Sequence, residues 1–356
     1  MRAGILNVQW LNNYGSIILA YCMQKKLDIL GLNNEVIDFR PRLPDKNGEI
    51  PSAHKEENAS SRGKIEKCEE FRRNFLRRSA PIVGTNGADK LDYDAYIVGS
   101  DTVWTPLKID DVEAKMYYLN FLEEKKAKRI AWSVSIGSEE KSDLDMMRIH
   151  LTEHLKNFDF ISVRERETTA FVQSLTNKKV CHAIDPALML DKEDYNEILP
   201  GNTDPGEKYI YAFLFDDLKG GYDTINELSE KTGLKVVGNV KHMDRINNLL
   251  VDSNDDGPGE FIERILNAEY VITDSYHALV FAMLGRKPFV CYTRSGSGIR
   301  ARNLLEDLGL SQRFLLDDEK GTGLLLEDID YDDVFRKRDA WREKSEAFLR
   351  QACMGV

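Results

Sequence analysis

Short apolar runs alternate along the chain with segments whose apolar residues recur at the spacing of a helix. Residues 3–8 form one apolar run and residues 34–39 form the next. Between them, residues 16–30 carry apolar side chains at helical spacing, and Gly31 follows as a fitting helix stop. The pattern predicts a strand, a helix and a strand, which together make a β-α-β unit with a right-handed crossover.

The same alternation continues along the chain and predicts an α/β protein. Further strands are predicted at residues 95–98, 129–134, 160–163, 179–184, 208–213, 234–237, 270–273 and 288–291. Helices are predicted at residues 65–77, 142–157, 166–176, 222–232, 259–267, 276–285, 300–308 and 332–351. Because such alternation favours parallel sheets covered by helices, we expect two doubly wound, Rossmann-like domains over residues 1–190 and 191–331. Residues 332–356 are expected to form a C-terminal helix that packs back on the first domain.

Composition and charge restrict the classes of function. The 356 residues carry 49 Lys and Arg against 60 Asp and Glu, a net charge of −11, whereas a nucleic-acid-binding protein is normally basic. The acidic excess lies wholly in residues 191–356, which hold 21 basic and 32 acidic residues. An odd number of cysteines, five, without zinc-ligand spacing indicates a reduced, cytoplasmic protein. No apolar run approaches the length of a membrane span.

Two turns that follow predicted strands in the first domain are candidate binding sites, because open α/β sheets bind ligands at the carboxyl ends of their strands. The first turn, residues 12–16, contains Asn13, Tyr14 and Gly15 before a helix. The second contains Ser100, Asp101 and Trp104. A carboxylate, a hydroxyl and an indole ring suit a sugar, although each turn is equally compatible with a purely structural role.

A third turn, in the second domain, favours an anion. Residues 270–273 are followed by Ser275, Tyr276 and His277, with Ser275 as the expected cap of the next helix. A helix N-terminus attracts negative charge. Between residues 275 and 305 the chain carries basic side chains and no acidic one. These basic residues are Arg286, Lys287, Arg294, Arg300 and Arg302. The segment predicts a phosphate or carboxylate site, while a buried structural role for His277 remains equally open.

Two further features have competing interpretations. Arg164 follows the predicted strand at residues 160–163 and either binds a carboxylate or phosphate or pairs with the neighbouring Glu165 or Glu167. Residues 252–263 match the calcium-loop pattern, but Pro258 and the lack of a second copy speak against calcium. We expect no metal and no cofactor.

Seven segments, taken in order, resemble the polysaccharide pyruvyl transferase family. They are NNYGSIILAYCMQKKLDILGLNNEVIDF (12–39), DAYIVGSDTVW (94–104), IAWSVSIGS (130–138), FISVRERET (160–168), IDPALML (184–190), GPGEFIERILNAEYVITDSYHALVFAMLGRKPFV (257–290) and IRARNLLEDLGL (299–310). Two positions depart from the usual pattern, with Thr102 in place of glutamine and Ala278 in place of glycine.

The resemblance implies a two-domain fold similar to GT-B glycosyltransferases and transfer of a pyruvyl group from phosphoenolpyruvate (PEP) to a sugar diol, with release of phosphate. It places PEP on the second domain and the acceptor on the first. The resemblance implies that Arg164, His277, Lys287 and Arg300 bind PEP, and the turn adds Ser275 and Tyr276 to this expected set. His277, Arg164 and Asp101 are the expected catalytic residues. His277 acts either as acid or base or as a phosphate ligand. The acceptor residues are Asn13, Tyr14, Gly15, Ser100, Asp101 and Trp104.

The expected acceptor is a nucleotide- or lipid-linked glycan precursor, and a lipid-linked one would bring the protein to a membrane surface. Two alternatives stay open: a GT-B glycosyltransferase that uses a nucleotide sugar, and a non-catalytic protein that binds sugars or phosphometabolites. Neither the acceptor sugar nor the oligomeric state follows from the sequence.

Overall fold

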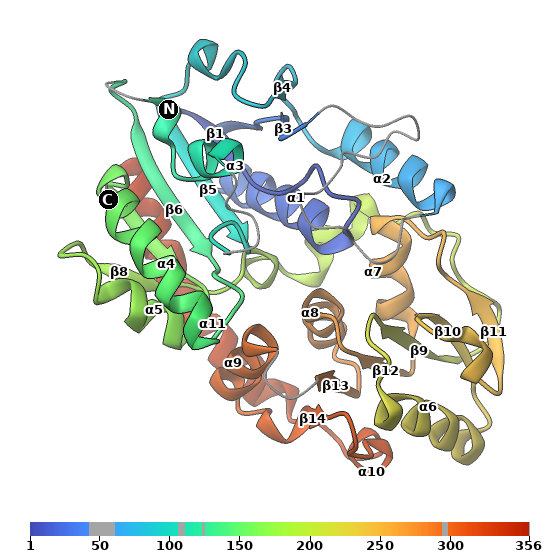
Figure 1. The fold of residues 1–356 in the computed structure, drawn as a ribbon. Helices are drawn as coiled ribbons and strands as arrows, with labels where there is room; N and C mark the ends of the chain where they lie inside the picture. Colours follow the sequence, from blue (N-terminus) through green and yellow to red (C-terminus); the bar gives the residue numbers. More distant parts are fainter. Residues whose placement is uncertain (43–60, 106–110, 123–124, 294–297, 356) are drawn as a thin grey trace. The chain divides into compact units, whose positions relative to one another are not determined.

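The predicted strands assemble into parallel sheets (Figure 1). A computed structural model describes residues 1–42, 61–105, 111–122, 125–293 and 298–355. Within these residues, the strands form two six-stranded sheets and one two-stranded sheet. The chain divides into an N-terminal unit, Met1–Leu190 with Asp339–Val356, and a C-terminal unit, Asp191–Arg338. The structure is therefore α/β, with two doubly wound, Rossmann-like units.

The N-terminal unit is built around one sheet in the order β2-β1-β5-β6-β7-β8. Its strands are β1 (Arg2–Leu6), β2 (Asn33–Val36), β3 (Phe39–Arg40), β4 (Ile82–Val83), β5 (Ala95–Asp101), β6 (Lys128–Val134), β7 (Phe160–Val163) and β8 (Val180–His182). Its helices are α1 (Tyr14–Ile29), α2 (Arg62–Phe75), α3 (Asp111–Tyr117), α4 (Lys141–His154) and α5 (Arg166–Gln173). The predicted strand at residues 34–39 is split, because β2 ends at Val36 and β3 pairs separately with β4.

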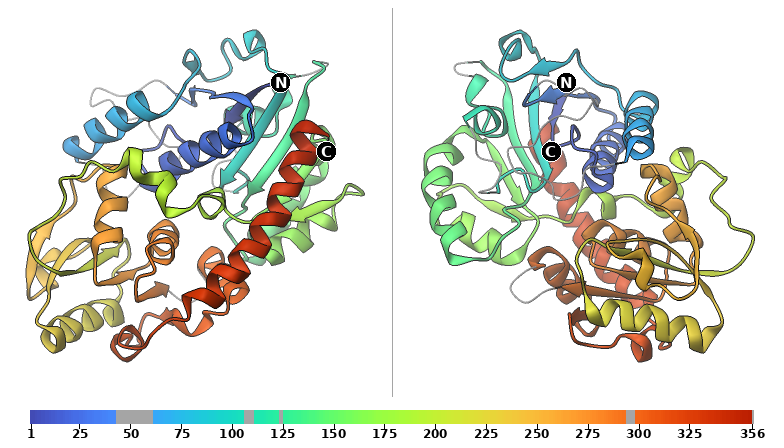
Figure 2. Two further views of the ribbon diagram at one scale, coloured as in Figure 1. Left: turned by 180° about the vertical axis from the view of Figure 1, so that it is seen from behind. Right: turned by 45° about the vertical axis from the view of Figure 1, so that its right-hand side comes forward.

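Helices cover both faces of this sheet. The α1 helix packs against β1, β2 and β5. On the other face, Met147 and Leu151 of α4 join Val98 and Ala131 in one hydrophobic core. The last part of α11 (Tyr331–Met354) lies beside α1, where Lys26 and Glu346 form an ion pair of 2.7 Å, and Figure 2 shows it running past the strands of this unit.

The C-terminal unit repeats the architecture, with strand order β11-β10-β9-β12-β13-β14. Its strands are β9 (Tyr209–Leu214), β10 (Lys235–Val240), β11 (Leu249–Asp252), β12 (Tyr270–Thr273), β13 (Phe289–Thr293) and β14 (Phe314–Leu316). Its helices are α6 (Lys219–Thr232), α7 (Pro258–Asn267), α8 (Tyr276–Leu284), α9 (Ile299–Leu308), α10 (Thr322–Leu325) and the start of α11. Alternate residues of β9 face opposite sides: Ile210 and Ala212 pack with α6, whereas Phe213 contacts Phe261 of α7.

The strand order places one reversal in each sheet. In the first sheet, β1 lies between β2 and β5, and in the second, β9 lies between β10 and β12. The chain therefore leaves β1 and β5, and likewise β9 and β12, toward helices on opposite faces. Such a reversal opens a crevice at the carboxyl ends of the strands, which is where ligands bind in doubly wound folds.

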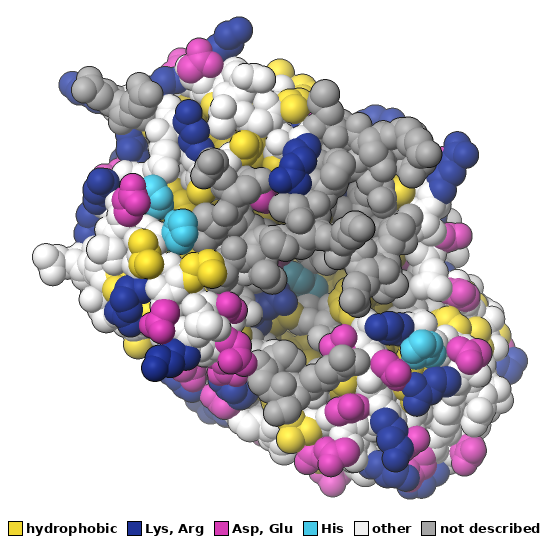
Figure 3. Space-filling model, in the orientation of Figure 1, with side chains coloured by type: hydrophobic (Ala, Val, Ile, Leu, Met, Phe, Trp, Pro, Cys, Tyr) yellow, Lys and Arg dark blue, Asp and Glu magenta, His cyan; other side chains and the backbone are white. Residues whose placement is uncertain are grey.

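Within the described ranges, no helix combines the length and hydrophobicity that crossing a lipid bilayer requires. Basic and acidic side chains are interspersed on the face of the molecule shown in Figure 3. This face is therefore mixed in charge, unlike the broad basic surface that is typical of nucleic-acid binding.

Candidate functional site

At the reversal of the N-terminal sheet, Asp101 ends β5 and accepts a hydrogen bond from the Ser16 hydroxyl, 2.9 Å from Oγ to Oδ2. Ser16 lies in the first turn of α1, whose cap is Asn13; the Asn13 side chain accepts a bond from the Ser16 amide, 3.3 Å. Asp101 has φ of 75°, a left-handed conformation that few residues other than glycine adopt. Such strain is concentrated at functional sites. The structure thus brings two separately predicted turns together at one sheet reversal.

Arg164, at the end of β7, joins the same edge of the sheet. Its guanidinium pairs with Asp185 at 2.6 Å and with Glu165 at 3.2 Å, and one nitrogen lies 3.8 Å from Asp101. Arg164 is 3% exposed. Three carboxylates around one guanidinium leave this cluster net negative, so it does not suit a phosphate group. The contacts fit a residue that positions Asp101 better than one that binds PEP.

Asp101 is itself buried, and the other predicted acceptor residues apart from Asn13 are buried as well. Trp104 is fully buried and its ring packs against Tyr118 and Phe158 in the core of the N-terminal unit. In the structure, therefore, no face of the Trp104 ring reaches the surface, where the prediction placed a sugar. Ser100 is also fully buried, and its hydroxyl donates to the Ser133 carbonyl, 2.6 Å away.

The two remaining acceptor candidates lie in the first turn of α1. Tyr14 is 4% exposed, and the Lys64 ammonium lies 4.6 Å from the centre of its ring. Gly15, also buried, follows Tyr14 directly. Among the predicted acceptor residues, Asn13 and Asp101 are therefore the two whose side chains accept hydrogen bonds from Ser16 at the sheet reversal.

At the reversal of the C-terminal sheet, Asp274 follows β12 and accepts hydrogen bonds from the amides of Phe215 and Asp216, at 2.9 and 2.8 Å. These amides follow β9, so one carboxylate joins the two strands that flank the reversal. The next residue, Ser275, caps α8 by accepting a bond from the Ala278 amide at 3.4 Å. His277 lies in the first helical turn and is 6% exposed.

Arg300 approaches this turn from the start of α9. Its guanidinium carbon lies 5.7 Å from the centre of the Tyr276 ring, which in turn meets the His277 ring edge-on at 5.2 Å. The α9 helix is capped by Gly298, whose φ of 86° suits glycine, and a Cβ there would lie 2.7 Å from the Thr293 hydroxyl. The structure therefore brings together the predicted residues 275, 276, 277 and 300.

Lys287 does not belong to this group. It precedes β13, whereas His277 follows β12, and the two strands are parallel. Seven residues of α8 follow His277 before the helix ends, a rise of about 10 Å. Burial lowers the pKa of Lys287, and the charged groups near it are Glu269, Lys192 and Lys208. Glu269 directly precedes β12 and Lys208 directly precedes β9, so Lys287 lies at the edge of the sheet where these strands begin. The structure therefore does not bring Lys287 to the turn that contains His277, because a crossover helix returns the chain to the opposite edge of the sheet.

The predicted basic segment is divided for the same reason. Arg286 lies at the end of α8, near Lys287, where it pairs with Asp332 at 3.0 Å and its guanidinium lies 4.9 Å from the centre of the Phe335 ring. Arg302 lies 3.9 Å from Glu306 on α9. Arg294 falls outside the described residues. Arg300 is thus the described arginine of this segment that contacts the start of α8.

Sequence reasoning did not assign a role to Asp274 or Asp185. Burial raises the pKa of Asp274 to about 7, against the opposing effect of the two amides that it accepts from. The sequence does show that Asp274 directly follows a predicted strand. That position indicates a place at the sheet reversal only once the order of the strands is known.

The calcium-loop pattern is accounted for by protein contacts. Both carboxylate oxygens of Glu263 accept hydrogen bonds from the Gly201 amide and from the amide and hydroxyl of Thr203. Asp256 pairs with Arg264. Gly257 caps α7, which begins at Pro258. Within the described residues, no group of three or more His, Cys, Asp or Glu side chains is arranged to hold a metal ion.

Comparison with solved structures shows the fold. The chain is similar to a protein assigned as a UDP-N-acetylglucosamine 2-epimerase from Listeria monocytogenes, with a TM-score of 0.60 at 9% identity over 100% of this chain and 97% of that one. It is also similar to UDP-GlcNAc 2-epimerase from Neisseria meningitidis, with a TM-score of 0.52 at 11% identity over 99% and 94%. An alpha-glucosyltransferase solved with UDP and DNA has a TM-score of 0.50 at 13% identity over 99% and 95%. At these identities the likeness concerns the fold alone.

The sequence assigns the chain to a more specific group than the fold does. Among curated proteins, none matches it. Residues 13–296 match the model of the polysaccharide pyruvyl transferase family, a span that begins after β1 and includes α1, β5 and the start of α8. The chain therefore belongs to the polysaccharide pyruvyl transferase family.

Proposed function

We propose that this protein transfers a pyruvyl group from PEP to two hydroxyls of one sugar in a polysaccharide or glycan precursor, forming a cyclic ketal and releasing phosphate. Membership of the family supports the class of reaction. The observation that carries the donor assignment is the turn at the start of α8, where Ser275, His277 and Arg300 meet at the reversal of the C-terminal sheet.

PEP carries a phosphate and a carboxylate, and the turn at α8 offers complementary charge. The positive end of the helix dipole and the amides of the first turn attract an anion. Arg300 adds a guanidinium above Tyr276, within the same cluster as His277. His277 is placed to hold the phosphate or to transfer a proton. Stabilising the departing phosphate in this way lowers the barrier to its loss.

The acceptor is assigned to the reversal of the N-terminal sheet. Asp101 orients a sugar hydroxyl and accepts its proton, while Ser16 and Arg164 hold the Asp101 carboxylate. The first hydroxyl adds to the central carbon of PEP as the methylene carbon gains a proton. Phosphate then leaves, and the second hydroxyl adds to the same carbon with loss of its own proton. The sum is one ketal and one phosphate for each PEP and diol consumed.

The test measures phosphate release with PEP and candidate sugars together, with mass spectrometry of the sugar for the added pyruvyl group. Release is expected only when both substrates are present. His277→Ala and Arg300→Ala are expected to abolish the rise in melting temperature that PEP causes by mass action. The matched control is Arg302→Ala, on the same helix as Arg300, which is expected to keep that rise.

The same thermal measurement separates the alternatives. Stabilisation by UDP and not by PEP would replace this proposal with a nucleotide-sugar glycosyltransferase. Stabilisation by PEP without any product across the acceptors tried would indicate a binding protein. Full activity in both His277→Ala and Arg300→Ala would remove the site assignment.

A further inference from the structure

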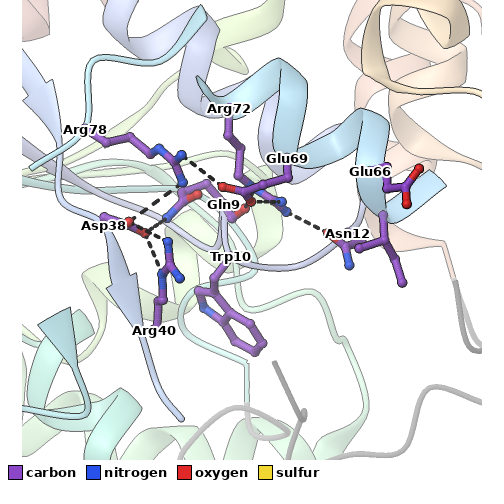
Figure 4. Close-up of a pocket in the computed structure, with 10 residues that line it drawn as sticks. Gln9, Trp10, Asn12, Asp38, Arg40, Glu66, Glu69, Arg72 and Arg78 are labelled. Carbon is purple, nitrogen blue, oxygen red and sulfur yellow. Dashed lines mark hydrogen bonds and ion pairs between the residues drawn. The ribbon is translucent and has the colours of Figure 1, made fainter. Parts of the chain in front are cut away.

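A polar cavity of about 340 Å³ lies in the N-terminal unit, between the segment that follows β1 and the helix α2 (Figure 4). Gln9, Trp10 and Asn12 line it from the first side, and Glu66, Glu69 and Arg72 from the second. Its volume falls at the lower end of the range of small-molecule sites, roughly 300–1,000 Å³. It lies where β1 ends, at the same edge of the sheet as Asp101. Asn12, which lines the cavity, is only four positions before Ser16, the residue that bonds to Asp101.

The cations of this cavity are already neutralised. Arg78 pairs with Glu69 at 3.0 Å and lies 3.7 Å from Asp38, which also pairs with Arg40 at 2.8 Å. Figure 4 shows Asp38 between Arg40 and Arg78. Burial raises the pKa of Glu69, but the charges of Arg72 and Arg78 outweigh this effect and lower it overall, so the carboxylate stays charged. An anionic ligand would have to displace a carboxylate, whereas a neutral polar ligand would not.

The side chain of Arg72 holds the wall formed by the segment after β1. Its Nε donates to the carbonyl of Gln9 at 2.8 Å, and Nη2 donates to the carbonyl of Leu11 at 2.6 Å and to the side chain of Asn12 at 3.0 Å. Arg72 is 3% exposed. These bonds fix the backbone that carries Gln9 and Trp10, so the wall is preorganised for a ligand.

Gln9 supplies an unused hydrogen-bond acceptor. Its side-chain nitrogen donates to Asp38 at 3.3 Å, and because a carboxylate only accepts, this bond fixes which end of the amide is the oxygen. That oxygen, Oε1, is fully buried and accepts no hydrogen bond from any described residue. A buried acceptor without a donor is costly. A ligand hydroxyl that reached this oxygen would satisfy it.

Trp10, which is 6% exposed and lines the cavity, supplies a small apolar surface beside these polar groups. Its indole nitrogen donates to the Tyr117 hydroxyl at 3.1 Å, which anchors the edge of the ring. Trp10 lines the cavity together with Ile65 of α2. An aromatic wall beside charged and amide groups suits a sugar ring, which presents C–H groups on one face and hydroxyls around its rim.

We propose that this cavity binds one uncharged sugar residue of the acceptor, with a ring hydroxyl donating to Gln9 and the sugar face against Trp10. The identification of that sugar as part of the acceptor rests on the proposed function. The cavity is separate from the Asp101 cluster and would select the acceptor by a sugar ring rather than take part in the reaction. It therefore replaces the fully buried Trp104 as the aromatic element of the acceptor site.

Sugar binding is tested without PEP, by saturation-transfer NMR on the full chain with the methyl glycosides of glucose, galactose and mannose as probes. At least one glycoside is expected to bind. Gln9→Met keeps the volume of the side chain and removes its amide, and it is expected to weaken that binding about fivefold to tenfold. Glu66→Ala changes an exposed wall residue, is expected to weaken binding as well, and stays informative if Gln9→Met does not fold. Glu70→Ala, an exposed change on the same helix outside the cavity, is the matched control and is expected to bind like the wild type.

Three outcomes would overturn the proposal: no binding of any of these glycosides, binding that neither cavity variant weakens, and binding of inorganic phosphate in place of the glycosides. The result is independent of the PEP chemistry. Glycoside binding that depends on Gln9, without any PEP-dependent phosphate release, would retain the sugar site and reject the transfer reaction. Phosphate release that persists unchanged in both cavity variants would retain the transfer and reject this site.

Discussion

Ser16 donates a hydrogen bond to Asp101 across the point at which the strand order of the N-terminal sheet reverses. The C-terminal sheet has an equivalent bridge, in which the Asp274 carboxylate accepts from the amides after β9. In both units a carboxylate that follows a central strand joins the two strands flanking the reversal. The two carboxylates differ in their neighbours, since Asp101 lies near Arg164 and Asp274 lies beside the α8 turn.

Asp101→Asn is expected to lower kcat/KM about 100-fold to 10,000-fold, the range for loss of a general base. Asparagine still accepts the bond from Ser16, so the change removes proton acceptance and leaves the local contact in place. Ser16→Ala is expected to cost about tenfold, as the loss of one hydrogen bond to a charged group. The rise in melting temperature with PEP serves as the control and should be the same in both variants. Wild-type kcat/KM in Asp101→Asn would exclude it as the base.

Arg164→Ala is expected to lower the free energy of unfolding by about 3–5 kcal/mol, because it leaves buried carboxylates without their guanidinium. Urea unfolding followed by circular dichroism measures this change. Arg166→Ala, two residues away and exposed, is the matched control, with an expected change within about 0.5 kcal/mol. If the two variants unfold at the same urea concentration, the ion pairs of Arg164 do not contribute to the free energy of unfolding as their contacts indicate.

Asp274 should make stability depend on pH with a defined sign. Its pKa is raised to about 7 in the folded protein from an ordinary value of 3.8. The folded state therefore holds a proton that the unfolded state releases, and the resulting stabilisation is present below about pH 4 and lost as pH rises to 7.

The comparison with Asp274→Asn isolates this effect, because other titrating groups cancel between the two proteins. Melting temperatures are measured from pH 4 to 8 in both. The difference, wild type minus variant, is expected to fall as pH rises through this range and then to level off. A difference independent of pH would mean that the Asp274 carboxylate titrates at its ordinary value.

Trp104→Ala is expected to destabilise the protein by about 3–5 kcal/mol, the usual cost of removing a large buried aromatic side chain. Trp104→Phe keeps a ring against Tyr118 and Phe158, so it should fold and retain the wild-type KM for the acceptor. Steady-state kinetics with varied acceptor check this. A large increase in KM for Trp104→Phe with normal stability would show that Trp104 contributes to acceptor binding after all.

The sequence alone determined the main elements, the α/β class and the family. Apolar runs and helical spacing depend on neighbouring residues, so they located strands such as β5 and β12 and helices such as α8 to within a few residues. Two edge strands were missed: β11, whose four residues are partly or fully exposed, and β14, which has only three residues. The turn with Ser275 and His277 was also predictable, since a cap and the residues after it are adjacent in the chain.

Only the tertiary structure decided which distant residues meet. Lys287 is nearer to His277 in sequence than Arg300 is, yet it lies at the opposite edge of the sheet, while Arg300 reaches the Tyr276 ring. The partners of Arg164, the burial of Trp104 and the cavity beside Gln9 likewise depend on strand order and helix packing. Local patterns encode which face of an element is apolar, but they do not specify which other element will cover it. That choice comes from packing the whole chain at once.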